Sequence, residues 1–110
     1  MKLYFYILDT DRKTGKWNLH LEECEVIEKP KTYKPVDKFP KGIYRSFIPK
    51  TAIGGFLDCY AEVVVLSEKN YKKVKERFLN NYNYNIKTLK EKISTYEDMI
   101  AAVNAGEDKI

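Results

Sequence analysis

The sequence predicts an α+β fold, in which a small antiparallel β-sheet or partly open barrel of four to five strands precedes a long C-terminal amphipathic helix. Short runs of β-branched and aromatic residues, separated by turn residues, fill the first 66 positions. Apolar residues then recur every three or four positions from 71 to 103, and no proline interrupts them. We therefore expect a β-sheet unit over 1–66 and a helix over 67–105.

The composition indicates a single folded domain over 1–110. Hydrophobic residues make up 44% of the chain and charged residues 33%, which is too apolar for a disordered segment. The net charge of +4 favours acidic partners only weakly. Because no apolar run is long enough for a membrane span and the N-terminus lacks a signal-peptide pattern, we expect a cytoplasmic protein without a membrane partner.

Several strands can be placed in the first half of the chain. Residues 3–8 carry apolar side chains on both faces, which is typical of a central strand. The polar stretch 9–16 leads into alternating apolar residues at Trp17, Leu19 and Leu21, which predicts a β-hairpin. The alternation loses phase at residues 22–23, where we expect a bulge or a bend.

The middle of the chain is punctuated by prolines. The Pro/Lys-rich stretch 28–42 predicts an extended loop, and residues 43–48 predict a further strand that Pro49 ends. A short helical turn closed by glycine is expected at 50–55. Residues 60–66 concentrate β-branched side chains and give the strongest strand prediction, for a strand buried centrally.

Ser67 is the predicted N-cap of the long helix, because its hydroxyl precedes the helical pattern. Four asparagines lie within 80–85, and each is a weak helix former. A kink or a helical hairpin there is the alternative to one continuous helix. We favour one helix because the apolar register continues across this stretch.

The second half of the helix carries apolar residues in a 3-4-3-4-3 spacing, which is the pattern of a seam between two helices. As one helix, the segment from about residue 68 to residue 103 would be about 54 Å long, more than a sheet of this size can cover. We therefore predict a homodimer with a coiled-coil seam. The predicted interface residues are Ile86, Leu89, Ile93, Tyr96, Ile100 and Val103.

No pattern of catalytic or metal-binding residues is visible. His20 is the only histidine, and Asp9, Asp11 and Gly15 match a calcium loop poorly because Lys13 replaces an oxygen ligand. Cys24 and Cys59 lack the spacing of a zinc or redox site and are predicted to be buried thiols. We expect a non-enzymatic protein without a cofactor or a metal.

Lysines and aromatic residues alternate in the proline-rich loop and on through residues 44–47, a composition typical of surfaces that follow phosphates and stack on bases. The first helical turns add a second basic cluster. The alternative interpretation is a solvated loop and helix face with the aromatic side chains in the core. The candidate contacts to nucleic acid or an acidic partner are Lys29, Lys31, Tyr33, Lys34, Lys38, Lys41, Arg45, Lys69, Lys72, Lys73 and Arg77.

Four segments, 6–10, 14–17, 28–33 and 44–50, carry a resemblance to small uncharacterised proteins of phages and integrated elements in Gram-positive gut bacteria. The resemblance implies an accessory factor or an inhibitor of host defence, of which an anti-CRISPR-type inhibitor is one form. DNA mimicry needs a strongly acidic face, and this chain is basic. An inhibitor of this composition would act as a wedge or compete for a nucleic-acid site.

These features favour a protein-interaction module that forms a homodimer and binds or inhibits a partner whose identity the residues do not give. The alternative is an accessory protein that binds nucleic acid through the Lys/aromatic loop.

Overall fold

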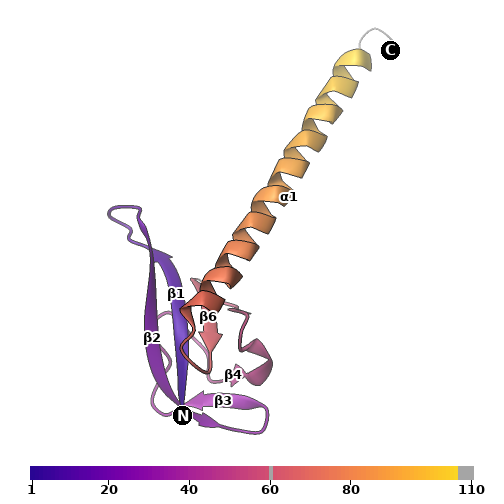
Figure 1. Cartoon of the computed structure of the whole chain (residues 1–110). Helices are drawn as coiled ribbons and strands as arrows, with labels where there is room; N and C mark the ends of the chain where they lie inside the picture. The colour runs from indigo at the N-terminus through magenta and orange to yellow at the C-terminus, as the bar shows by residue number, and fades with distance from the viewer. Residues whose placement is uncertain (60, 107–110) are drawn as a thin grey trace. The chain divides into compact units, whose positions relative to one another are not determined.

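One long antiparallel hairpin forms the frame of the N-terminal half of the chain. The computed structural model describes residues 1–59 and 61–106. Strand β1 spans Lys2–Thr10 and strand β2 spans Trp17–Glu28. They pair without interruption from Lys2 opposite Glu25 to Thr10 opposite Trp17, which confirms the predicted hairpin (Figure 1).

The hairpin turn is held by backbone hydrogen bonds around Asp11. The carbonyl of Asp11 accepts from the Gly15 amide at 2.7 Å, and the Asp11 amide donates to the Lys16 carbonyl at 2.9 Å. Asp11 Oδ1 also accepts from the Lys13 amide at 2.8 Å. Gly15 takes a φ of 71°, which a side chain would disfavour. This stretch is therefore a structural turn, and its polar residues are used in forming it.

Four shorter strands complete one antiparallel sheet of order β4-β3-β2-β1-β6-β5. Their bounds are Thr32–Pro35 for β3, Ile48–Pro49 for β4, Phe56–Leu57 for β5 and Glu62–Leu66 for β6. The sheet curls into an open half-barrel, which confirms the predicted fold class. The strand count is six, not four to five, because β4 and β5 have two residues each and no periodicity to detect.

The strand predicted over 43–48 is wrong except at its last residue. Only Ile48 of that range belongs to a strand, and β4 ends at Pro49, which pairs with Thr32 as its last residue. A proline is tolerated there because β4 is an edge strand. In the strand predicted over 60–66, Tyr60 lies outside the described residues, and β6 begins at Glu62.

The predicted bulge at residues 22–23 is also wrong, since the pairing of β1 and β2 keeps one register throughout. The apolar residues change face instead. Leu19 and Leu21 lie on one face of β2, whereas Cys24 and Val26 lie on the other and are buried. A strand that is covered on different faces at its two ends loses alternation without any irregularity in its backbone.

The main core lies on one face of the sheet. Leu3, Phe5 and Ile7 of β1 form its centre, and the loop between β3 and β4 covers them with Phe39 and Ile43. The rings of Phe5 and Phe39 lie 5.8 Å apart. The remaining buried members of this cluster are Cys24, Val26, Tyr33, Ile48, Leu57, Val63 and Val65. The predicted two-sided burial of β1 is confirmed, because Tyr6 is buried on the opposite face.

A short 3-10 helix, η1, spans Lys50–Ala52 and connects β4 to β5. Gly54 closes it with a φ of 85° and donates its amide hydrogen to the Val65 carbonyl at 2.8 Å. This confirms the predicted helical turn ended by glycine.

Helix α1 spans Tyr71–Gly106, so it begins four residues later than predicted, and Ser67 is not its N-cap. Asn70 takes that role: its Oδ1 accepts from the Lys73 amide at 3.0 Å. The Asn70 amide donates to the Tyr6 hydroxyl at 3.2 Å, which ties the helix start to β1. The cap was misplaced because Ser67 and Asn70 are both favourable capping residues and only the tertiary contact distinguishes them.

Helix α1 continues through the asparagine-rich stretch 80–85 without a break (Figure 1). This confirms the single helix and excludes the helical hairpin. The chain divides into two compact units, Met1–Val74 and Lys75–Ile110, and the division falls inside α1. The first unit contains the sheet, and the second contains most of the helix.

We predict that Asn70→Ala lowers the free energy of unfolding by about 1 kcal/mol, because it removes the side-chain acceptor of the first helical turn. Urea denaturation followed by circular dichroism measures this. Ser67→Ala is the matched control and is expected to leave the unfolding midpoint unchanged. A larger loss for Ser67→Ala than for Asn70→Ala would contradict the observed cap.

Candidate functional site

The apolar stripe of α1 changes character along the helix. Val74 and Phe78 are buried, and Phe78 stacks on Tyr82 with ring centroids 6.0 Å apart. From Ile86 onward every apolar residue of the stripe is exposed. The six predicted interface residues, Ile86, Leu89, Ile93, Tyr96, Ile100 and Val103, are between 50% and 75% exposed. The structure thus places all six on the surface of a single chain.

The exposed stripe has a heptad arrangement that the helix backbone maintains without interruption. Ile86, Ile93 and Ile100 occupy position a of the heptad, and Leu89, Tyr96 and Val103 occupy position d. Near the C-terminal end, Tyr96, Met99, Ile100, Val103 and Asn104 line a shallow, mainly apolar hollow of about 380 Å³. Hollows between side chains of this kind receive the side chains of a facing helix in a coiled coil.

All ten predicted cationic contacts are on the surface. In the loop and the adjoining strands, Lys29, Lys31, Lys34, Lys38, Lys41 and Arg45 are exposed, as are Lys69, Lys72, Lys73 and Arg77 near the start of α1. Three of them come together: Lys38, Lys41 and Arg45 line one hollow of about 550 Å³ with Tyr44. Lys29, Lys31 and Lys34 do not line it.

Tyr33 is a correction to the predicted contact set. Its side chain is buried in the core, and the Lys50 ammonium lies 5.5 Å from the centre of its ring. Phe39 is also buried. The exposed aromatic residues of this region are Tyr44, at 84% exposure, and Phe47, at 45%. Stacking on bases would therefore use Tyr44 and Phe47, not Tyr33.

A second hollow, of about 620 Å³, lies on the core face of the sheet beyond the end of the hydrophobic cluster. Ile7 and Ala61 are its apolar lining residues. It shares Lys41 and Tyr44 with the first hollow, the one that Lys38 and Arg45 also line. Its other polar residues are Asp9, Arg12, His20 and Glu22. Sequence reasoning missed it, although the alternation of β2 places His20 and Glu22 on the same face as Cys24.

The charges around this second hollow are mixed. His20 Nδ1 lies 3.9 Å from Asp9 Oδ1, and both side chains are substantially exposed. Arg12 and Lys41 carry positive charge against Asp9 and Glu22. An open site with balanced charges does not concentrate one sign of field on a substrate, and it favours no particular reaction.

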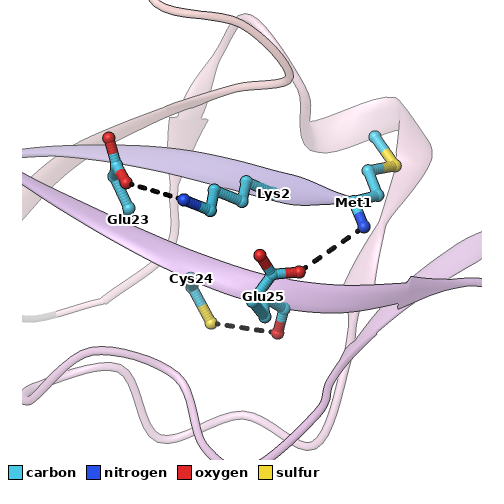
Figure 2. A network of polar contacts seen from close by, with 5 residues as sticks. All are labelled: Met1, Lys2, Glu23, Cys24 and Glu25. Atoms are coloured by element: carbon cyan, nitrogen blue, oxygen red, sulfur yellow. Dashed lines mark hydrogen bonds and ion pairs between the residues drawn. The ribbon is translucent and has the colours of Figure 1, made fainter.

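Glu23 and Glu25 of β2 form ion pairs with neighbouring cationic groups at the surface. Glu23 lies 3.3 Å from the Lys2 ammonium and 3.2 Å from the Lys69 ammonium. Figure 2 shows Lys2 reaching Glu23, and Glu25 reaching the amino group of Met1 at 3.5 Å. Lys69 also lies 6.0 Å above the Tyr4 ring. Lys69 therefore has partners within the chain and is a weaker candidate for binding an acidic partner.

Neither cysteine has the surroundings of a reactive thiol. The Cys24 thiol is buried and donates to the Lys38 carbonyl at 3.4 Å, and burial raises its pKa. The Cys59 thiol is half-buried and donates to the Ala61 carbonyl at 3.1 Å, and its pKa is also raised, mainly by burial. A raised pKa lowers the thiolate fraction and makes both groups poor nucleophiles.

Within residues 1–59 and 61–106, His, Cys, Asp and Glu side chains form no group of three or more that could hold a metal ion. In the same residues, no helix combines the length and the apolar character that crossing a membrane requires.

Comparisons with known proteins leave the family open. No family model matches the chain, and neither the curated proteins nor the solved structures give a significant match.

We predict a pH-dependent effect of Glu23→Gln. Hydrogen bonds from Lys69 and Lys2 hold the pKa of the Glu23 carboxyl below its usual value of 4.5. A lowered folded-state pKa stabilises the protein above pH 4.5, and this contribution is lost as the pH falls through the folded-state value.

Glu23→Gln should therefore lower the urea midpoint slightly at pH 7, and by less at pH 2, because the contribution decreases as the pH falls below 4.5. Chemical denaturation at both pH values measures the difference. An equal loss at pH 2 would show that the substitution acts through packing and not through charge.

Proposed function

We propose that the chain is a non-enzymatic interaction module, which self-associates through the exposed stripe of α1 and uses its Met1–Val74 unit to bind a partner. The single observation behind this proposal is the exposure of all six apolar residues from Ile86 to Val103. An apolar surface of this continuity on a soluble helix is the usual sign of an interface. Anti-CRISPR-type inhibition, which the phage resemblance implies, is one activity that such a module would serve.

The energy available from the stripe is consistent with dimerisation. Covering the exposed half of an Ile, Leu or Tyr side chain contributes about 1 kcal/mol. Twelve such side chains in two copies contribute about 12 kcal/mol, which is comparable to an association cost of about 4–15 kcal/mol. The margin is small, so the dimer depends on every layer of the seam. One charged residue inside the seam is enough to separate the two copies.

We predict that Ile93→Asp converts a dimer into a folded monomer, because it buries a carboxylate in the centre of the seam. Size-exclusion chromatography with light scattering gives the mass, and circular dichroism checks the fold. The matched control is Ser94→Asp, which adds the same charge at an exposed position outside the seam. This control should remain dimeric. A wild-type protein that is monomeric up to about 100 μM would remove the proposal, since specific dimers form at or below that range.

A second candidate function, nucleic-acid binding, is favoured by one specific observation. Tyr44 is the most exposed large hydrophobic side chain of the described residues, and it lines one hollow with Lys38, Lys41 and Arg45. Cations beside an exposed aromatic ring are the elements of a single-strand binding surface. Asp37 lines the same hollow and weakens the positive field.

We predict that, if this surface binds single-stranded nucleic acid, Tyr44→Ala weakens binding by about 5- to 100-fold through lost stacking. Arg45→Ala should reduce the slope of the log binding constant against the log salt concentration by about 1, since one phosphate contact is lost. Fluorescence anisotropy with single-stranded DNA and RNA at 50 and 200 mM salt measures both. Tyr84→Ala removes an equally large exposed ring from α1 and is the control. Binding that is absent, or that does not weaken with salt, would exclude this function.

A further inference from the structure

We infer that the second copy packs on the stripe of α1 in the antiparallel direction. The two-fold axis crosses the seam at the level of the midpoint between residues 94 and 95, between Ile93 and Tyr96. This inference rests on the proposed self-association and adds the orientation and register of the partner helix. It is carried by three features of the described helix: the symmetry of the stripe, the distribution of charge along it and the identity of the facing side chains.

The spacing of the stripe reads the same in both directions. The steps of 3, 4, 3, 4 and 3 residues from Ile86 to Val103 are symmetric about the midpoint between residues 94 and 95. An antiparallel copy therefore meets every residue of the stripe with another of its residues, as an in-register parallel copy also would, so the spacing fixes the register and the next two features decide the orientation. The antiparallel layers are Ile86 with Val103, Leu89 with Ile100, and Ile93 with Tyr96 of the second copy.

Charge is segregated about the same midpoint. Lys87, Lys90 and Lys92 precede it with only Glu91 between them, whereas Glu97 and Asp98 follow it. No lysine or arginine lies between residues 93 and 106. The first turn of α1 has no acidic residue and the last turn has no basic residue, so the side-chain charges add to the helix dipole. Antiparallel helices bring these opposite ends together, and parallel helices would bring like charges together.

The two orientations use different lysines at short range. In an antiparallel pair, residues at position e face each other, which places Lys90 near Glu97 of the second copy. In a parallel pair, position g faces position e, which would place Lys92 near Glu97 instead. The Lys92 ammonium already lies 6.0 Å from the Tyr96 ring of its own chain. Lys90 is exposed beside the stripe.

The packing favours the same orientation. A parallel pair would set the ring of Tyr96 against Tyr96 and the small side chain of Val103 against Val103. The antiparallel pair sets Tyr96 against Ile93 and Val103 against Ile86, so large and small residues alternate across the seam. The N-terminal ends of the two helices then lie at opposite ends of the pair.

A charge-exchange series tests the orientation. Glu97→Lys should weaken the dimer about tenfold in sedimentation equilibrium, because two attractive contacts become repulsive. The double variant Lys90→Glu/Glu97→Lys should restore wild-type affinity. The double variant Lys92→Glu/Glu97→Lys has the same composition of charge and serves as the matched control, and it should not restore affinity.

Disulfide cross-linking gives an independent readout. Proteins carrying Ile86→Cys and Val103→Cys, with tags of different size, should form a mixed disulfide dimer under mild oxidation and no disulfide dimer when each is oxidised alone. Wild-type protein gives the background from Cys24 and Cys59. Cross-linking of Ile86→Cys with itself, or rescue of affinity by Lys92→Glu, would overturn the antiparallel arrangement. So would a dimer that none of the charge variants alters. A monomeric wild-type protein would instead overturn the proposed self-association.

Discussion

The apolar stripe of α1 from Ile86 to Val103 is the constraint on which the functional account depends. Six large side chains are at least half exposed, although the helix that carries them is continuous and regular. Water contact along such a stripe is unfavourable by about 25 cal/mol for each Å² of apolar surface. An isolated helix of this length has modest stability in water, and most helices in proteins are stabilised by packing along one face. A helix partner for this face would therefore stabilise both the interface and the helix.

The sheet unit is stabilised differently, because its core is closed within one chain. The main cluster covers one face of the half-barrel, and Tyr6 is buried on the other. Asn70 joins β1 to the start of α1 within this unit: its side chain caps the helix and its amide donates to the Tyr6 hydroxyl. The helix thus begins at a position that β1 determines. The first turn of α1 is fixed by this contact within the Met1–Val74 unit.

Much of the fold could be predicted from the sequence. The β1–β2 hairpin, the buried β6 and the long helix all have strong periodicity or β-branched composition, and these were correct. The two-residue strands β4 and β5 could not be predicted, since their pairing depends on neighbours distant in sequence. The change of face in β2 imitates a bulge, because alternation reports which side is covered and not the backbone itself.

The candidate site was predictable only where a single helix determines it. The stripe follows from helical spacing alone, so its six residues could be identified from the sequence, and all six are exposed; that they form an interface stays a prediction. Tyr33 was misassigned because its burial depends on the pairing of β3 with β4, which no local pattern reveals. The second hollow, which Lys41 and Tyr44 line together with His20 and Glu22, was also missed. It forms only when the loop between β3 and β4 folds over the sheet, and no local pattern reveals that.

Hydrogen exchange of the α1 amides at increasing protein concentration tests the central claim most directly. If a second copy covers the stripe, the amides from residue 86 to residue 103 should become more protected as the concentration rises. Amides of β1 and β6 should keep the same protection throughout, since their core is closed within one chain. Protection over 86–103 that does not change with concentration would contradict self-association through this face.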